Sequence, residues 1–150
     1  MVDDLRRLVE TESPSRDLDS LRRSALVLAE VMTSRLGSAP RLVESEHGPH
    51  VHWSGGGSPS VLVVGHHDTV FPLGALAQRP FAVGDGRATG PGVFDMKGGI
   101  VQAIHGVAAL SDASGIEILI SADEEIGSGA SRDLIVERAR ACGAVLVLEP

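Results

Sequence analysis

The alternation of hydrophobic and polar residues divides the chain into helices and strands. Apolar residues at three- and four-residue spacing predict a helix over 2–11 and another from a cap at Asp17 or Asp19 to about Leu36. Two further helices are predicted at Lys97–Leu110 and Ser131–Ala141, the latter capped by Ser131. Short apolar runs predict strands at Arg41–Ser45, Val51–Trp53, Val61–Val64, Ile116–Ile120 and Ala144–Leu148. Residues 71–92, rich in proline and glycine, predict a long loop with at most short strands.

The order of these elements from residue 61 onward is strand, loop, helix, strand, helix, strand. This βαβαβ order predicts an α/β fold with a mostly parallel sheet and helices on both faces. The runs Val61–Val64 and Ala144–Leu148 are continuously apolar, so both are expected to be buried on their two faces.

Composition narrows the class of protein. The chain has 150 residues, a size typical of one domain, and its 43% of hydrophobic residues argues against disorder. A net charge of −7 argues against nucleic acid as a partner, and no apolar run is long enough to span a membrane. The single cysteine, Cys142, excludes an internal disulfide. An acidic start, unlike a signal peptide, predicts a cytoplasmic protein.

Metal-binding residue types follow each of the three buried strands. The first strand runs into Gly65–Thr69, the second into Asp123–Glu125 and the third into Glu149, while Asp95 stands just before a helix. Ligands in open α/β sheets bind beyond the carboxyl ends of the strands. A single carboxylate after a strand is more often a cap or a solvated residue, but convergence of several with a histidine predicts a site for Zn²⁺ or a similar cation.

Spacing within these segments suggests separate roles. His66 and Asp68 are two residues apart and would point the same way in an extended segment, so the carboxylate can orient the imidazole. The adjacent Glu124 and Glu125 would point apart, which separates a metal ligand from a general base. The alternating histidines at 47, 50 and 52 are better explained by a hairpin than by a metal site.

Four segments together resemble a family of dinuclear-zinc peptidases and amidohydrolases. This family includes acetylornithine deacetylase, succinyl-diaminopimelate desuccinylase, aminoacylase and bacterial glutamate carboxypeptidase. The matching segments, in order, are His66–Val70, Gly90–Gly99, Asp123–Ser128 and Leu148–Pro150. Glu149-Pro150 and the run Ser131–Ile135 favour the glutamate carboxypeptidase branch.

The resemblance implies two zinc ions, with cobalt or manganese as alternatives. The implied metal ligands are His66, Asp95, Glu125 and Glu149. Asp95 would bridge both metals, Glu149 would complete the first site and Glu125 would bind the second metal. The family pattern also places a cis peptide bond between Asp95 and Met96.

The two implied catalytic residues are Glu124 and Asp68. Glu124 would be the general base for the attacking water, and Asp68 would hold His66. The implied reaction is metal-dependent hydrolysis of an amide bond in an N-acyl amino acid or short peptide, of the glutamate carboxypeptidase type. A biosynthetic deacylase of the acetylornithine or succinyl-diaminopimelate type and a metal-binding module without catalysis are the alternatives.

The family pattern extends beyond these 150 residues. Its second metal site takes a histidine from far downstream, and its dimerisation domain is an insertion that residues 1–150 lack. The resemblance therefore predicts that residues 1–150 are the N-terminal part of a catalytic metal-binding domain. The second metal site would be incomplete here, this chain alone inactive, and the full-length protein a homodimer.

Overall fold

A computed structural model describes all residues from Met1 to Pro150. The helices are α1 (Val2–Glu10), α2 (Leu18–Leu36), α3 (Ala75–Gln78), α4 (Gly98–Ala108) and α5 (Arg132–Ala141), with the helical turns η1 (Val93–Lys97) and η2 (Glu124–Ile126). The strands are β1 (Arg41–Val43), β2 (His50–Ser54), β3 (Val61–His66), β4 (Ala82–Gly84), β5 (Arg87–Thr89), β6 (Ile116–Ser121) and β7 (Ala144–Val147). None of the helices is long and apolar enough to cross a membrane.

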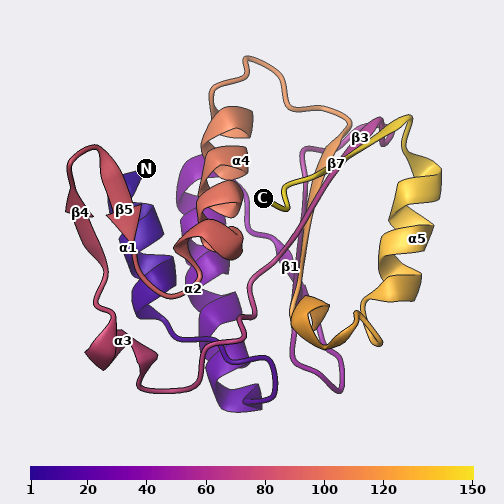
Figure 1. The fold of residues 1–150 in the computed structure, drawn as a ribbon. Helices are drawn as coiled ribbons and strands as arrows, with labels where there is room; N and C mark the ends of the chain where they lie inside the picture. The colour runs from indigo at the N-terminus through magenta and orange to yellow at the C-terminus, as the bar shows by residue number, and fades with distance from the viewer.

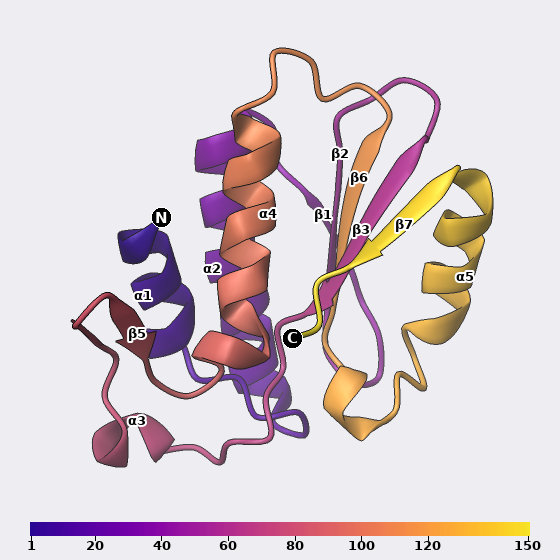
Figure 2. The ribbon, with the colours of Figure 1, turned by 45° about the horizontal axis from the view of Figure 1, so that its top comes forward.

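Five strands form one sheet in the order β1-β2-β6-β3-β7. β6, β3 and β7 are parallel, whereas β1 and β2 run antiparallel to their neighbours. Figure 2 shows α1, α2 and α4 on one side of the sheet and α5 on the other. The step from β3 to β6 and the step from β6 to β7 run in opposite directions across the sheet, so crossovers of one hand place α4 and α5 on opposite faces. The α/β fold with a mostly parallel sheet is therefore confirmed.

The main core lies between the sheet and the α1, α2 and α4 layer. Helix α2 contributes side chains at helical spacing that are fully buried, among them Leu21, Ala25 and Leu28. Asp17 caps this helix, since its carboxylate accepts a hydrogen bond from the Ser20 amide at 2.8 Å. The predicted loop 71–92 contains the short helix α3 and the β4-β5 hairpin, which lie beyond α1, away from the sheet (Figure 1).

β7 differs from its prediction as a buried strand. It is hydrogen-bonded to β3 alone, at the edge of the sheet, and Val145, Leu146 and Val147 are 42%, 53% and 63% exposed. A continuous apolar run indicates a strand between two covering layers, but it does not say whether residues 1–150 supply those layers. The expectation of a buried β7 is therefore wrong for these residues.

The predicted cap of α5 also differs. Ser131 stands at the N-cap position, but its hydroxyl makes no capping hydrogen bond. The buried carboxylate of Asp123 instead accepts hydrogen bonds from the Ala130 and Ser131 amides, at 2.7 and 3.2 Å. A residue that follows β6 therefore fixes the start of α5, a contact that local sequence rules do not reveal.

A buried ion pair holds α5 against the sheet. Glu117 of β6 is 3% exposed and accepts hydrogen bonds from the Arg138 guanidinium on both of its oxygens. The His52 ring from β2 lies 3.1 Å from the same carboxylate. Burial alone would raise the pKa of Glu117, but the hydrogen bonds from Arg138 and His52 outweigh it and hold the pKa below its usual value.

Replacing Glu117 by glutamine is expected to lower the free energy of unfolding by about 1.5–3 kcal/mol, the worth of hydrogen bonds to a charged group. Because the folded pKa is lowered, the stabilisation is complete above the unfolded pKa near 4.5 and is lost as pH falls through the folded value. Urea unfolding at pH 7 and at pH 3 measures both effects. Glu137→Gln, on the exposed side of α5, is the matched control. A Glu117→Gln variant as stable as Glu137→Gln at pH 7 would contradict the assignment.

Candidate metal centre

The carboxyl ends of the three parallel strands meet at one edge of the sheet. His66 is the last residue of β3, η2 follows β6, and Glu149 follows β7. Asp95 reaches the same place from η1, the turn before α4. In Figure 2 the end of the chain after β7 lies beside the end of β3 and the first turn of α4. The fold thus brings together four segments that are up to 83 residues apart in the sequence.

The imidazole of His66 lies at the middle of a group of carboxylates. Its Nε2 atom is 3.1 Å from Asp95 Oδ1, 3.4 Å from Glu149 Oε1 and 3.9 Å from Glu124 Oε2. Ligand atoms about 2.0–2.2 Å from a tetrahedral zinc ion are themselves roughly 3.3 Å apart, so the two shorter distances match the spacing of ligands around one ion. One imidazole and several carboxylates also form a donor set suited to zinc.

Two groups of atoms are close enough to hold a metal ion. One consists of His66, Asp95 and Glu125, and the other of His66, Glu124 and Glu149. All the predicted ligands thus come together, but the two groups share His66, whereas the family resemblance makes Asp95 the shared ligand. The imidazole is fully buried, while the side chains of Asp95, Glu124 and Glu149 are 42–49% exposed.

Asp68 is completely buried and connects the two sides of this centre. Its Oδ1 lies 3.3 Å from His66 Nδ1, and its two oxygens accept hydrogen bonds from the Glu124 and Glu125 amides, each at 3.2 Å. The backbone carbonyl of Asp68 accepts a hydrogen bond from His66 Nδ1 at 2.9 Å. Because Nδ1 carries this proton, Nε2 presents its lone pair to the carboxylates when the ring is neutral. The predicted contact between His66 and Asp68 is confirmed.

The charges of the centre shift its protonation equilibria. Burial alone would lower the pKa of His66, but the hydrogen bond and charge of Asp68, together with the charge of Glu149, raise it to about 9. Burial raises the pKa of Glu125, and the neighbouring carboxylates raise it further. Burial likewise raises the pKa of Glu149, and its contact with Asp95 adds to the effect. Like charges therefore crowd here, and a cation would relieve their repulsion.

The turn that carries Asp95 is held in place by the two residues that follow Asp95. Met96 is fully buried and its sulfur accepts a hydrogen bond from the His66 amide at 3.1 Å. Lys97, the only lysine of the chain, is 2% exposed, and its ammonium group donates to the carbonyls of Leu8 and Thr11 at 2.9 and 3.0 Å. The peptide bond between Asp95 and Met96 is cis, as the resemblance implies.

Sequence patterns do not reveal these supporting contacts. The only sequence signal for a special role of Lys97 is that it is the sole lysine of the chain and precedes an apolar helix. No sequence pattern indicates the contacts of the loop between α1 and α2. In this loop Ser13 donates to the carbonyl of His67 at 2.6 Å, and Ser15 donates to the carbonyl of Thr69 at 3.1 Å. The loop between α1 and α2 therefore lies against the segment that follows β3, beside the centre.

His67 and His105 contact groups outside this centre. His67 points away from His66 and lies 3.1 Å from both the Ser24 hydroxyl and the Pro49 carbonyl. His105 pairs with Asp4 at 2.7 Å. No potential metal group includes the histidines at 47, 50 and 52.

Comparisons with known proteins find a peptidase family and individual relatives that are similar to this chain. Residues 62–150 match peptidase family M20/M25/M40. Over 101 residues the chain is 42% identical to carboxypeptidase G2 of Pseudomonas sp. strain RS-16, covering 64% of this chain and 24% of that protein. It is 36% identical over 104 residues to succinyl-diaminopimelate desuccinylase of Acidiphilium cryptum, covering 64% of this chain and 28% of the relative. The chain thus spans about a quarter of the length of these relatives.

Solved structures share the fold. An M20 metallo-carboxypeptidase of Sulfolobus solfataricus superposes with a TM-score of 0.78 at 20% identity, over 97% of this chain and 36% of that one. Human carnosine dipeptidase 1 gives a TM-score of 0.73 at 21% identity, over 97% and 37% of the two chains. Together with the match over residues 62–150, these findings show that the chain belongs to peptidase family M20/M25/M40.

Proposed function

We propose that this protein hydrolyses the amide bond of an N-acyl amino acid or short peptide with the help of bound metal, in the manner of a glutamate carboxypeptidase. The observation that carries the proposal is the position of His66 Nε2, 3.1–3.4 Å from carboxylates of Asp95 and Glu149 at the carboxyl edge of the sheet. The similarity of the chain to carboxypeptidase G2 supports this reaction class. Similarity to succinyl-diaminopimelate desuccinylases, at 36–40% identity, favours a biosynthetic deacylase as the second candidate.

The proposed ligands of the first metal are His66, Asp95 and Glu149, and those of the second are Asp95 and Glu125. We favour Asp95 as the bridging ligand because the turn that carries it is fixed on both sides and its carboxylate is half exposed. Zinc suits this donor set, and cobalt or manganese would fit the same ligands. A metal bound there supplies a Lewis acid and lowers the pKa of a water molecule.

Glu124 is the proposed general base. Its carboxylate is 46% exposed and lies 3.9 Å from His66 Nε2, farther than the carboxylates of Asp95 and Glu149. This position suits a group that accepts a proton from the attacking water and later returns it to the leaving amine. Asp68 is the proposed positioning residue, because it holds both the His66 ring and the backbone of Glu124.

Residues 1–150 are proposed to be the N-terminal part of the catalytic domain. The second metal has only two proposed carboxylate ligands here, and the imidazole that would complete its site is proposed to come from outside these residues. Full activity and a homodimeric state are proposed for a protein that contains the remainder. The 150-residue chain alone would act as a metal-binding module without catalysis.

Zinc titration of the 150-residue chain is expected to show one tight site. His66, Asp95 and Glu149 form a three-ligand site open to water, whereas two carboxylates alone hold zinc weakly. Isothermal titration calorimetry gives the stoichiometry, and thermal unfolding should show a higher melting temperature with zinc. His66→Ala should remove the tight site, and the half-exposed His47, replaced by alanine, is the matched control. Two tight sites, or a His66→Ala variant that binds zinc as tightly as the wild type, would contradict the ligand assignment.

Glu124→Gln tests the general base. In a protein that carries the complete catalytic domain, this change should lower kcat by about 10²–10⁴-fold, the usual contribution of general base catalysis. Zinc content, measured by elemental analysis, should remain that of the wild type, because the proposed base acts on water and is not a ligand. Loss of zinc in Glu124→Gln would instead make Glu124 a ligand, as its grouping with His66 and Glu149 allows.

A further inference from the structure

Three buried side-chain atoms have no hydrogen-bond partner within the chain. They are His50 Nε2 of β2, Asp123 Oδ1 in the segment after β6, and the hydroxyl oxygen of Ser131 at the N-cap position of α5. The three residues are 1%, 0% and 1% exposed, so bulk solvent does not supply the missing partners. Buried polar groups in proteins are nearly always hydrogen-bonded, and each of these atoms therefore requires an explanation.

Hydrogen bonds bring these three residues together at the start of α5. The Ala122 amide donates to His50 Nδ1 at 3.1 Å, so the imidazole lies beside the residue that precedes Asp123. The second oxygen of the Asp123 carboxylate, Oδ2, accepts hydrogen bonds from the Ala130 and Ser131 amides at 2.7 and 3.2 Å. Burial lowers the pKa of His50, and the charge of Asp123 opposes this lowering. The start of β2, the end of β6 and the start of α5 thus converge on the three side chains.

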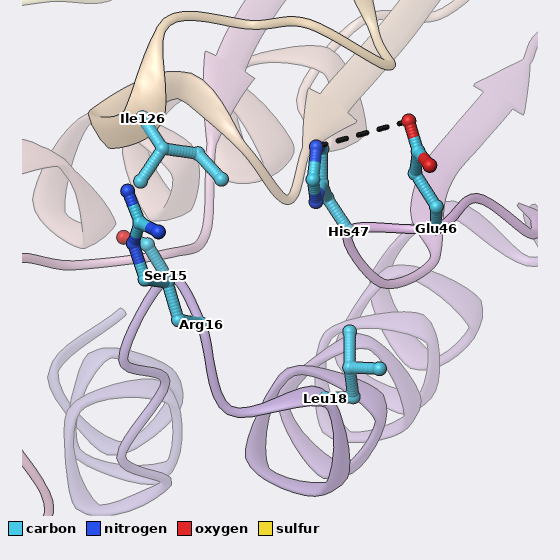
Figure 3. Close-up of a pocket in the computed structure, with 6 residues that line it drawn as sticks. All are labelled: Ser15, Arg16, Leu18, Glu46, His47 and Ile126. Carbon is cyan, nitrogen blue, oxygen red and sulfur yellow. Dashed lines mark ion pairs between the residues drawn. The ribbon is translucent and has the colours of Figure 1, made fainter.

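At the protein surface a pocket separates the turn before β2 from η2. Glu46 and His47 of this turn pair with each other at 3.9 Å. Figure 3 shows His47 on one side of the pocket, which has a volume of about 370 Å³, and Ile126 of η2 on the other. The hydrogen bond of His50 lies deeper, in the interior. The buried side chains, rather than those at the surface, therefore join β2 to the segment that carries η2.

The donors and acceptors among the three atoms match one water molecule. Because His50 Nδ1 accepts the Ala122 amide proton, the neutral ring carries its proton on Nε2, which is therefore a donor. Asp123 Oδ1 is an acceptor, and the Ser131 hydroxyl can donate. A water oxygen can accept from His50 and Ser131 and donate to Asp123, and about three hydrogen bonds are usual for a buried water. A ring nitrogen that carries a proton cannot bind a metal ion, which argues against a cation here.

We propose that His50 Nε2, Asp123 Oδ1 and the Ser131 hydroxyl bind one internal water molecule. The water joins β2 to the segment 122–131, in which Glu124 and Glu125 directly follow Asp123. It gives both oxygens of the Asp123 carboxylate hydrogen-bond partners and so holds this segment from the side opposite to Asp68. The site contains none of the proposed metal ligands, and the inference does not rest on the proposed hydrolysis.

A crystal structure of the 150-residue chain tests the site directly. We expect an ordered water oxygen within hydrogen-bonding distance of all three atoms. A direct hydrogen bond between two of the three side chains would overturn the proposal, and so would a metal ion identified by its anomalous scattering. A well-ordered site without a water peak would overturn it as well.

NMR of the same chain in solution provides a second readout. Proton–nitrogen spectra of the imidazole rings should show His50 neutral and protonated on Nε2, and this proton should give a nuclear Overhauser cross-peak to water. His67 is the matched control, because it is 2% exposed and its Nε2 donates to the Pro49 carbonyl. Its ring proton should give no such cross-peak. A His50 ring protonated on Nδ1, or a His50 ring proton without a cross-peak to water, would contradict the proposal.

Ser131→Ala distinguishes a bound water from the Ser131 hydroxyl, which exchanges its proton with solvent and can relay the same signal. The His50 cross-peak should persist in Ser131→Ala, because His50 and Asp123 still hold the water. Ser34→Ala, on the exposed side of α2, is the matched control and should leave the cross-peak unchanged. Loss of the cross-peak in a folded Ser131→Ala variant alone would assign the signal to the hydroxyl and overturn the proposal.

Discussion

The geometry of the candidate metal centre depends on the contacts of one buried group, the carboxylate of Asp68. It lies two residues after β3 and accepts hydrogen bonds from the two amides that begin η2, after β6. The same group stands against Nδ1 of His66 and so directs Nε2 toward the other carboxylates. A buried charge without partners would cost several kcal/mol, so the carboxylate is stable here only because its partners surround it. Burial would raise its pKa, but the hydrogen bonds from His66 and Ser15 and the charges of the neighbouring histidines together outweigh burial and lower it.

The surrounding fold brings the remaining groups to this point. The parallel arrangement of β3, β6 and β7 places three strand ends at one edge, and η1 adds Asp95 from the α4 side. Gly92, at the start of η1, has φ 70° and lies so near Thr69 that a Cβ would come within 2.8 Å of its methyl carbon. Met96 and Lys97 then tie this turn to β3 and to α1. These contacts thus hold Asp95 beside the strand ends that carry the other carboxylates.

Much of this arrangement could be predicted from the sequence because it follows from periodicity and strand order. The βαβαβ order alone implied that His66, Glu124 and Glu149 would meet at one edge, and two-residue spacing implied the contact between His66 and Asp68. What could not be predicted depends on segments that are distant in the sequence. Neither the hydrogen bond from Lys97 to the Leu8 carbonyl of α1 nor the position of Ser15 beside Thr69 leaves a local pattern. The exposure of β7 depends on what packs over it, which the apolar run itself does not encode.

The most direct test of this account is the zinc affinity of Asp68→Asn. The change keeps the volume of the side chain but removes the charge that orients His66, and circular dichroism of the metal-free variant checks that it is folded. Loss of a residue that orients a metal-ligating histidine typically weakens metal binding about 10–100-fold, and we expect a loss of this size in calorimetric titration with zinc. A folded Asp68→Asn variant that binds zinc as tightly as the wild type would contradict the claim that Asp68 assembles the metal centre.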